Sequence, residues 1–135
     1  MDSTITKVPL PQVVLSEGFW ASRQHLMTDV TIPYMERILR DEVPGAAKSH
    51  AIENFRMAAG ELQGEFYGMV FQDSDVAKWL EAAAYSLCIQ PDEALAARVR
   101  DIVALIGRAQ QPDGYLDTYF TVKHTIPRWT NLLEC

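Results

Sequence analysis

Residues 65–81 read EFYGMVFQDSDVAKWLE, and this stretch decides the fold because a glycine-punctuated aromatic loop runs directly into an acidic helix start. From Val76 onward, apolar residues recur at steps of three and four, as on a helix with one buried face; they are Val76, Trp79, Leu80, Ala83, Ala84 and Leu87. Asp73 or Ser74 is placed to cap that helix by accepting hydrogen bonds from its first free N–H groups. The preceding loop carries more apolar surface than a solvated connection, so we expect it to pack against the rest of the chain.

Upstream of this stretch, one long segment has the pattern of an amphipathic helix. The helix is expected to run from a cap at Ser16 to about Glu42. Pro33 lies inside it and is expected to kink it or divide it in two. The apolar positions that define its buried face are Phe19, Trp20, Leu26, Val30, Ile32, Met35, Ile38 and Leu39.

Two shorter segments complete the upstream half. Residues 1–15 contain two prolines, so at most an edge strand is expected there, and they show no basic flank or cleavage signature of a signal peptide. A short helix is expected over residues 50–59, between a cap at Ser49 and a stop at Gly60. We therefore treat residues 1–15 as an extended segment that precedes a helical domain.

Downstream, a turn at residues 90–92 restarts a helix that continues to about Gln110. Residues 115–129 are expected to form a long aromatic loop, and Asn131 is placed to begin another helix. The apolar positions of the restarted helix are Leu95, Val99, Ile102, Val103, Leu105 and Ile106.

The two central helices must run antiparallel because only a few residues join them. The start of the first, near Asp73, and the end of the second, near Gln110, then lie at the same end of the hairpin. Both aromatic loops therefore share one rim. No strand-period segment of any length follows residue 15, so the expected fold is all-α, built from antiparallel helical hairpins.

Composition excludes several classes of protein. The net charge is -6 and the twelve basic residues are scattered, which argues against a nucleic-acid surface. No apolar run approaches the roughly 20 residues of a membrane span, so no membrane partner is expected.

The cysteines and histidines indicate neither a disulfide framework nor a metal site. Of the two cysteines, Cys88 lies in an apolar helical pattern where a small buried thiol is expected, and the pair favours a reducing, cytoplasmic compartment. His25, His50 and His124 have no metal-ligand spacing, so metal binding by this chain is not expected.

Five residues around the central stretch are candidates for substrate binding. Asp73, Asp75 and Asp117 carry carboxylates that can accept hydrogen bonds from sugar hydroxyl groups, although a helix cap or loop support explains Asp73 as well. Gln72 is placed to donate to a hydroxyl group or to hold the loop. Tyr115 is placed to line a pocket or to fasten its own loop. No nucleophile set and no phosphate-binding loop is found, so no residue is assigned as catalytic.

Four strings of this sequence carry a family resemblance: SHAIENF at 49–55, AAG at 58–60, the opening stretch, and RAQQPDGYLDTYF at 108–120. Together they resemble the N-terminal part of glycoside hydrolase family 127, the β-L-arabinofuranosidase-like enzymes. The similarity runs from about Phe19 to Cys135.

The resemblance implies an α/α toroid, a six-hairpin barrel, of which residues 16–135 would be the N-terminal portion of a truncated catalytic domain. It also implies retaining hydrolysis of terminal β-L-arabinofuranosyl residues by the full-length enzyme. In that family a zinc-bound cysteine thiolate is the nucleophile and a glutamate is the acid/base, and these ligands lie beyond Cys135. The family's Gln-Asp-Ser-Asp string matches Gln72, Asp73 and Asp75, and its pocket-side loop matches residues 115–118. These residues would support or line the pocket wall, and the chain alone is expected to be inactive and to bind no zinc.

Other classes of protein remain open from the residues alone. A helical-repeat interaction module would also consist of stacked helix pairs, although no internal repeat is found. A small complete sugar-binding protein is a further alternative. Helices of an incomplete ring would expose apolar faces, so homo-oligomers or aggregates are expected.

Overall fold

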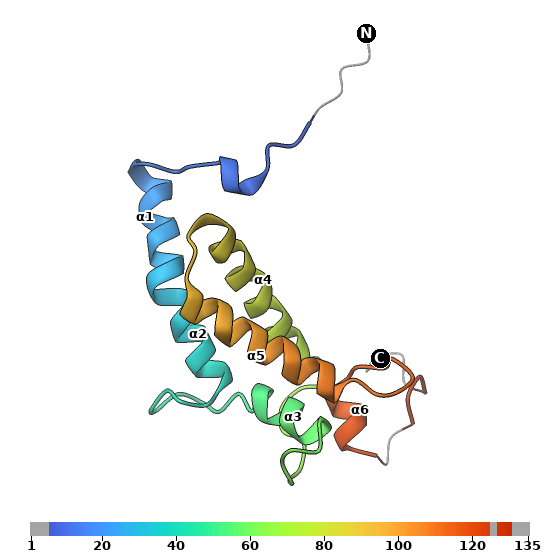
Figure 1. Ribbon diagram of the computed structural model, residues 1–135. Coiled ribbons are helices and arrows are strands. Elements are labelled where there is room, and N and C mark those ends of the chain that lie inside the picture. The colour runs from blue at the N-terminus through green and yellow to red at the C-terminus, as the bar shows by residue number, and fades with distance from the viewer. Residues whose placement is uncertain (1–5, 125–126, 131–135) are drawn as a thin grey trace.

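Two long helices, α4 (Asp73–Ile89) and α5 (Glu93–Ala109), form an antiparallel hairpin at the centre of the structure (Figure 1). The computed structural model describes residues 6–124 and 127–130, and every regular element in these ranges is helical. The shorter elements are η1 (Leu10–Gln12), α1 (Gly18–Leu26), η2 (Met27–Thr31), α2 (Ile32–Leu39), α3 (Ala51–Ala58) and α6 (Thr118–Val122). Helix α2 packs against α4, while α3 contacts α4, α5 and α6. The predicted all-α fold and its central hairpin are confirmed for the described residues.

The sequence of the hairpin explains its start and its inner face. The side chain of Asp92 accepts hydrogen bonds from Ala94 N and Leu95 N, which satisfies free N–H groups in the first turn of α5. Most of the predicted apolar positions are buried or half-buried, but Ala84 is exposed and Val103 is 53% exposed, so these two are wrong. Each buried Leu or Ile contributes about 1.5 to 3 kcal/mol by removal from water. The buried core cluster comprises Ile32, Leu39, Ala51, Ile52, Phe55, Val76, Trp79, Ala83, Leu95, Ile102, Leu105 and Ala109.

The first long helix is divided in front of Pro33, as predicted. Between α1 and α2, η2 is a π-helical turn, and Pro33 lies in the first turn of α2. Proline has no N–H to donate to the carbonyl four residues earlier, so the regular ladder is interrupted at this point. Trp79 Nε1 of α4 donates a hydrogen bond of 3.0 Å to the carbonyl of Ile32 and so fixes α4 to the start of α2.

The predicted buried face of this helix is wrong over its first half. Phe19, Trp20, Leu26, Val30 and Met35 are exposed, whereas Ile32 and Leu39 are buried. The reason is that the main described packing partner of α1 is its neighbour η2, and in α1 only Ala21 is buried. The predicted cap and end are also wrong, because the residue before α1 is Glu17 rather than Ser16 and α2 ends at Leu39.

A buried carboxylate joins α2 to α5. Glu36 is 5% exposed. Its Oε1 accepts a hydrogen bond from Arg40 Nε at 2.9 Å, and its Oε2 accepts one from Arg98 Nε at 2.8 Å. Removing either arginine would leave part of a buried charge without a partner.

Helix α3 ends as predicted but begins differently. Gly60 has φ +75°, a conformation in which other residues are strained, and its N–H closes the helix on the carbonyl of Met57. The predicted cap at Ser49 is wrong. His50 holds the cap position with φ 55°, and the carboxylate of Asp41 accepts hydrogen bonds from the N–H groups of Ser49 and His50.

The described part of residues 1–15 contains the 3₁₀ turn η1 and no strand, which agrees with the expectation of at most an edge strand, because Pro9 and Pro11 cannot donate to a sheet. Two further expectations need correction. The expected loop over residues 115–129 contains α6. Cys88 is exposed rather than buried. The helix expected from Asn131 lies outside the described residues.

Within the described residues, no helix combines the length and the apolar character that a membrane crossing requires.

Candidate functional site

The start of α4 is bonded directly to the start of α6. Asp73 Oδ2 accepts a hydrogen bond from Thr118 N at 2.8 Å, and Oδ1 accepts one from Thr118 Oγ1 at 2.6 Å. Thr118 is 1% exposed. The cap position of α4 is held by Gln72, whose side chain makes no cap hydrogen bond. The prediction that Asp73 or Ser74 caps α4 is therefore wrong. Asp73 instead accepts a hydrogen bond from the first N–H of α6. This agrees with the alternative interpretation given above, that Asp73 supports a loop.

Asp117 lies beside Asp73 at this junction. It precedes α6 and caps it by accepting a hydrogen bond from Phe120 N at 3.2 Å. Burial raises the pKa of Asp73 above its usual 3.8, although the hydrogen bonds from Thr118 act the other way. Burial also raises the pKa of Asp117, and the neighbouring charge of Asp73 adds to that rise. The two carboxylates therefore lie close enough, at one end of the hairpin, for the charge of Asp73 to act on Asp117.

The two aromatic loops meet at this end, as the antiparallel hairpin predicts. The rings of Phe66 and Tyr119 are in edge-to-face contact with centroids 5.1 Å apart. Phe66 is buried, but Tyr67, Met69 and Phe71 are 59–64% exposed. The prediction that this loop packs against the chain therefore holds for Phe66, and for Tyr67 through its ring contact with His50, and is wrong for Met69 and Phe71.

Gln72 connects the loop to α4 and to the residues that lead into α3. Its Nε2 donates to Asp75 Oδ2 at 3.2 Å and to Ser49 Oγ at 3.4 Å, and its Oε1 accepts from Met69 N at 3.4 Å. Gly68 has φ +106°, and a Cβ at that position would lie 2.8 Å from Gln72 Oε1. The positive φ therefore favours glycine here, and a larger residue would also displace the Gln72 amide from its hydrogen bonds.

Asp75 and Trp79, one turn apart on α4, line the same hollow of about 320 Å³ between α4 and the η2–α2 segment. Asp75 also pairs with Lys78, at 3.3 Å, and 46% of its side chain is exposed. The other lining residues are mainly apolar and include Met27, Ile32, Met35, Ile38 and Leu39. This hollow has an apolar wall with a few polar groups at its edge, which is the usual make-up of a small-molecule site.

Tyr115 lies in a different hollow. It shares that depression with Asp113, Arg128 and Trp129. The Arg128 guanidinium lies 3.9 Å from the centroid of the Tyr115 ring, and the Trp129 ring is in edge-to-face contact with Tyr115. The structure thus brings Gln72 and Asp75 together and Asp73 and Asp117 together, but it places Tyr115 in neither group.

One side chain that holds this site was missed by the sequence analysis. Asn54 of α3 is fully buried; its Nδ2 donates to Tyr67 O at 2.8 Å, and its Oδ1 accepts from Tyr67 N at 3.3 Å. The only signal in the sequence was a polar residue on the apolar face of a predicted helix.

A zinc–thiolate site does not fit the described residues. Cys88 is exposed on α4, and the three-residue group of potential ligands found among the described residues contains no cysteine. That group is Asp41, His50 and Glu53, which lie between the end of α2 and the start of α3.

Comparison with known proteins identifies the family. Residues 12–134 match the family model of the β-L-arabinofuranosidase GH127 catalytic domain. The chain is 46% identical over 123 residues to a non-reducing end β-L-arabinofuranosidase of Bifidobacterium longum subsp. longum, covering 82% of this chain and 19% of the relative.

Solved structures agree with the sequence match. A GH127 β-L-arabinofuranosidase from Geobacillus stearothermophilus T6 superposes with a TM-score of 0.85 at 55% identity, over 87% of this chain and 19% of that one. A second GH127 β-arabinofuranosidase gives a TM-score of 0.73 at 33% identity, over 85% of this chain and 17% of that one. The chain thus spans about a fifth of the length of these relatives, and the predicted resemblance is confirmed: it belongs to the glycoside hydrolase family GH127.

Proposed function

We propose that this chain forms one wall of the carbohydrate site of a β-L-arabinofuranosidase catalytic domain and carries no catalytic group of its own. The observation that carries the proposal is the pairing of Gln72 with Asp75 at the edge of a hollow lined by Trp79. Family membership supports the carbohydrate as ligand class, and residues 16–135 would contribute their helices to an α/α toroid. The helical-repeat module gains no support from any contact in the structure.

The chemistry of the wall suits a sugar. The Asp75 carboxylate accepts hydrogen bonds from hydroxyl groups. The Gln72 amide oxygen can accept one more besides that from Met69 N, while its two N–H groups donate to Asp75 and Ser49 and hold the carboxylate in place. The apolar lining gives a face against which the carbon side of a furanose ring can pack. Asp73 and Asp117 would act indirectly, because their oxygens already hold the start of α6.

Zinc belongs to the proposal only for the full-length family. When bound there, it would keep a cysteine thiolate deprotonated and oriented for attack. Because the described residues offer no such thiolate group, this chain would shape the pocket and exclude water while other segments supply the nucleophile.

The setting of the protein is also proposed. A reducing, cytoplasmic compartment suits a chain whose Cys88 is exposed as a free thiol. Self-association would be driven by the exposed side chains of α1 and of the loop before α4.

Two measurements test the proposed function. The purified chain, incubated with an aryl β-L-arabinofuranoside, zinc and a reductant, should release no product above the rate of the blank. In NMR titrations with L-arabinose, shifts should appear at Gln72 and Asp75, and Asp75→Asn should reduce them by several fold. Asp101→Asn, which removes an exposed carboxylate from α5, serves as the matched control. Turnover by the chain, or shifts that Asp75→Asn leaves unchanged, would contradict the assignment.

A further inference from the structure

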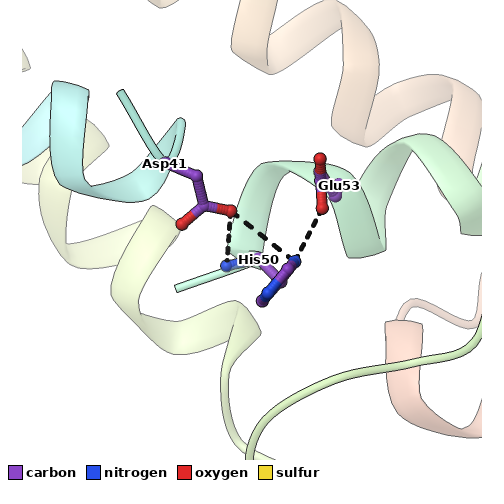
Figure 2. A group of neighbouring side chains, drawn as sticks. All are labelled: Asp41, His50 and Glu53. Carbon is purple, nitrogen blue, oxygen red and sulfur yellow. Dashed lines mark hydrogen bonds and ion pairs between the residues drawn. The ribbon is translucent and has the colours of Figure 1, made fainter. Parts of the chain in front are cut away.

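Three potential metal ligands converge where α2 leads into α3 (Figure 2). His50 Nδ1 lies 2.7 Å from Glu53 Oε2 and 3.7 Å from Asp41 Oδ2. All three ligand atoms lie within 4.8 Å of one another. His50 and Glu53 are three residues apart, so the first turn of α3 places both side chains on one face.

In the part of the chain that the structure describes, the imidazole is the one basic side chain that forms an ion pair with this cluster. The side chain of Asp41 is only 8% exposed. Among the described residues, its carboxylate and that of Glu53 form ion pairs with His50 alone. Arg40, the residue before Asp41, pairs with Glu36, and Lys48 directs its Nζ to the backbone carbonyl of Asp41. A bound cation would offset the charge of a nearly buried carboxylate that lies beside a second one.

We propose that Asp41, His50 and Glu53 bind a divalent cation of the manganese or zinc class. One imidazole nitrogen and two carboxylate oxygens are ligands that both ions accept. Metal–ligand bonds of about 2.1 Å put neighbouring ligand atoms about 3.0 to 3.4 Å apart. The observed separations of 2.7 and 3.7 Å lie on either side of that range.

The surroundings hold the ligands while leaving an entry path. Asp41 is oriented by hydrogen bonds from Ser49 N and His50 N, and the His50 ring packs on Tyr67 with centroids 4.5 Å apart. The side chains of Glu53 and His50 are 45% and 29% exposed, so an ion can reach them and Glu53 can rotate toward Asp41. Water would complete the coordination sphere.

The site differs in chemistry from a zinc–thiolate centre because it has no sulfur ligand. It would tie the end of α2 to the start of α3, and α3 in turn holds the loop before α4 through Asn54. The cation would therefore stabilise the scaffold and take no part in bond cleavage. The proposal does not depend on the carbohydrate function.

Titration of the full chain with Mn²⁺ tests the site, because this hard cation favours nitrogen and oxygen ligands over the cysteines. The electron paramagnetic resonance signal of free Mn²⁺ should report one bound ion per chain. Glu53→Gln, which keeps an acceptor for His50, should weaken binding at least about tenfold, and His50→Asn should do the same. His25→Asn, which removes an exposed imidazole on α1, should leave the affinity unchanged.

A second readout locates the ion. Bound Mn²⁺ should broaden the NMR signals of the His50 and Tyr67 rings before those of other side chains. The proposal is overturned if millimolar Mn²⁺ stays free, if Glu53→Gln binds as tightly as the parent chain, or if the broadening centres elsewhere. Circular dichroism of each variant checks that a loss of binding does not reflect unfolding.

Discussion

The carboxylate of Asp73 illustrates how one side chain can serve an element other than its own. It begins α4, yet both its oxygens accept hydrogen bonds from Thr118 of α6. Asp73→Ala would leave the N–H and hydroxyl of a buried threonine without partners, so we expect a loss of about 3 kcal/mol in the free energy of unfolding. Asp73→Asn keeps one acceptor for the N–H and offers its amide to the hydroxyl, so its loss should be under about 1 kcal/mol. Urea denaturation measures both, and equal losses would show that the charge rather than the hydrogen bonds matters.

The same residue predicts a pH dependence. Its pKa in the folded chain is raised above 3.8, mainly by burial. A group with a raised pKa contributes stability that is fully present below its unfolded pKa and is lost as pH rises through the folded value. The contribution of Asp73 to stability should therefore decrease as pH rises above about 3.8, and Asp73→Asn should remove this part of the slope. Denaturation midpoints of the two chains across acid pH give the comparison; parallel curves would contradict it.

Sequence patterns singled out the candidate residues of the site but did not predict their hydrogen-bond partners. The string Gln72, Asp73, Ser74 and Asp75 was predicted as one group, but only the structure separates its roles. Gln72 and Asp75 bond to each other, whereas Asp73 bonds to a residue 45 positions away. Local rules for helix caps describe neighbours in the chain, so they favoured a cap at Asp73 and could not find Thr118.

At the scale of elements, α3 supports the loop that leads into α4. The side chain of Asn54 is hydrogen-bonded to both the N–H and the carbonyl of Tyr67, as a neighbouring backbone would be. Asn54→Ala should cost about 2 to 4 kcal/mol in unfolding free energy, because two backbone groups and a cavity are left behind. The loop should also become the first site of limited proteolysis. Gln63→Ala, an exposed change before the same loop, is the control. Unchanged protection of the loop in Asn54→Ala would mean that other contacts hold it.

Helices whose start, period and packing partner are all local in the sequence were predicted best. The α4–α5 hairpin follows from periodicity, a short turn and the Asp92 cap, and the structure agrees. Helix α6 was missed because its five residues are too few to show a period, and its start depends on Asp73 and Asp117. The buried face assigned to α1 was wrong because an apolar stripe shows that a helix can be covered without showing what covers it.

For the whole molecule, the exposed apolar side chains predict self-association. Phe19 and Trp20 on α1 are 61% and 68% exposed and pack on each other. Sedimentation velocity should therefore show a mass that rises with protein concentration, and Phe19→Ser with Trp20→Ser should shift the distribution toward the monomer. Ser22→Ala, an exposed change on the same helix, should have no such effect. A chain that stays monomeric at high concentration would contradict the expectation.

The bond between Asp73 and Thr118 also sets an order of events when the chain folds. Closing a flexible stretch of 45 residues costs roughly 3 kcal/mol of chain entropy, as much as the two hydrogen bonds are worth. The bond should therefore form only after α4 and α5 have paired and brought its ends together. In stopped-flow kinetics, Asp73→Ala should leave the refolding rate nearly unchanged and accelerate unfolding. That result would mean that this junction forms after the folding transition state and breaks before it during unfolding.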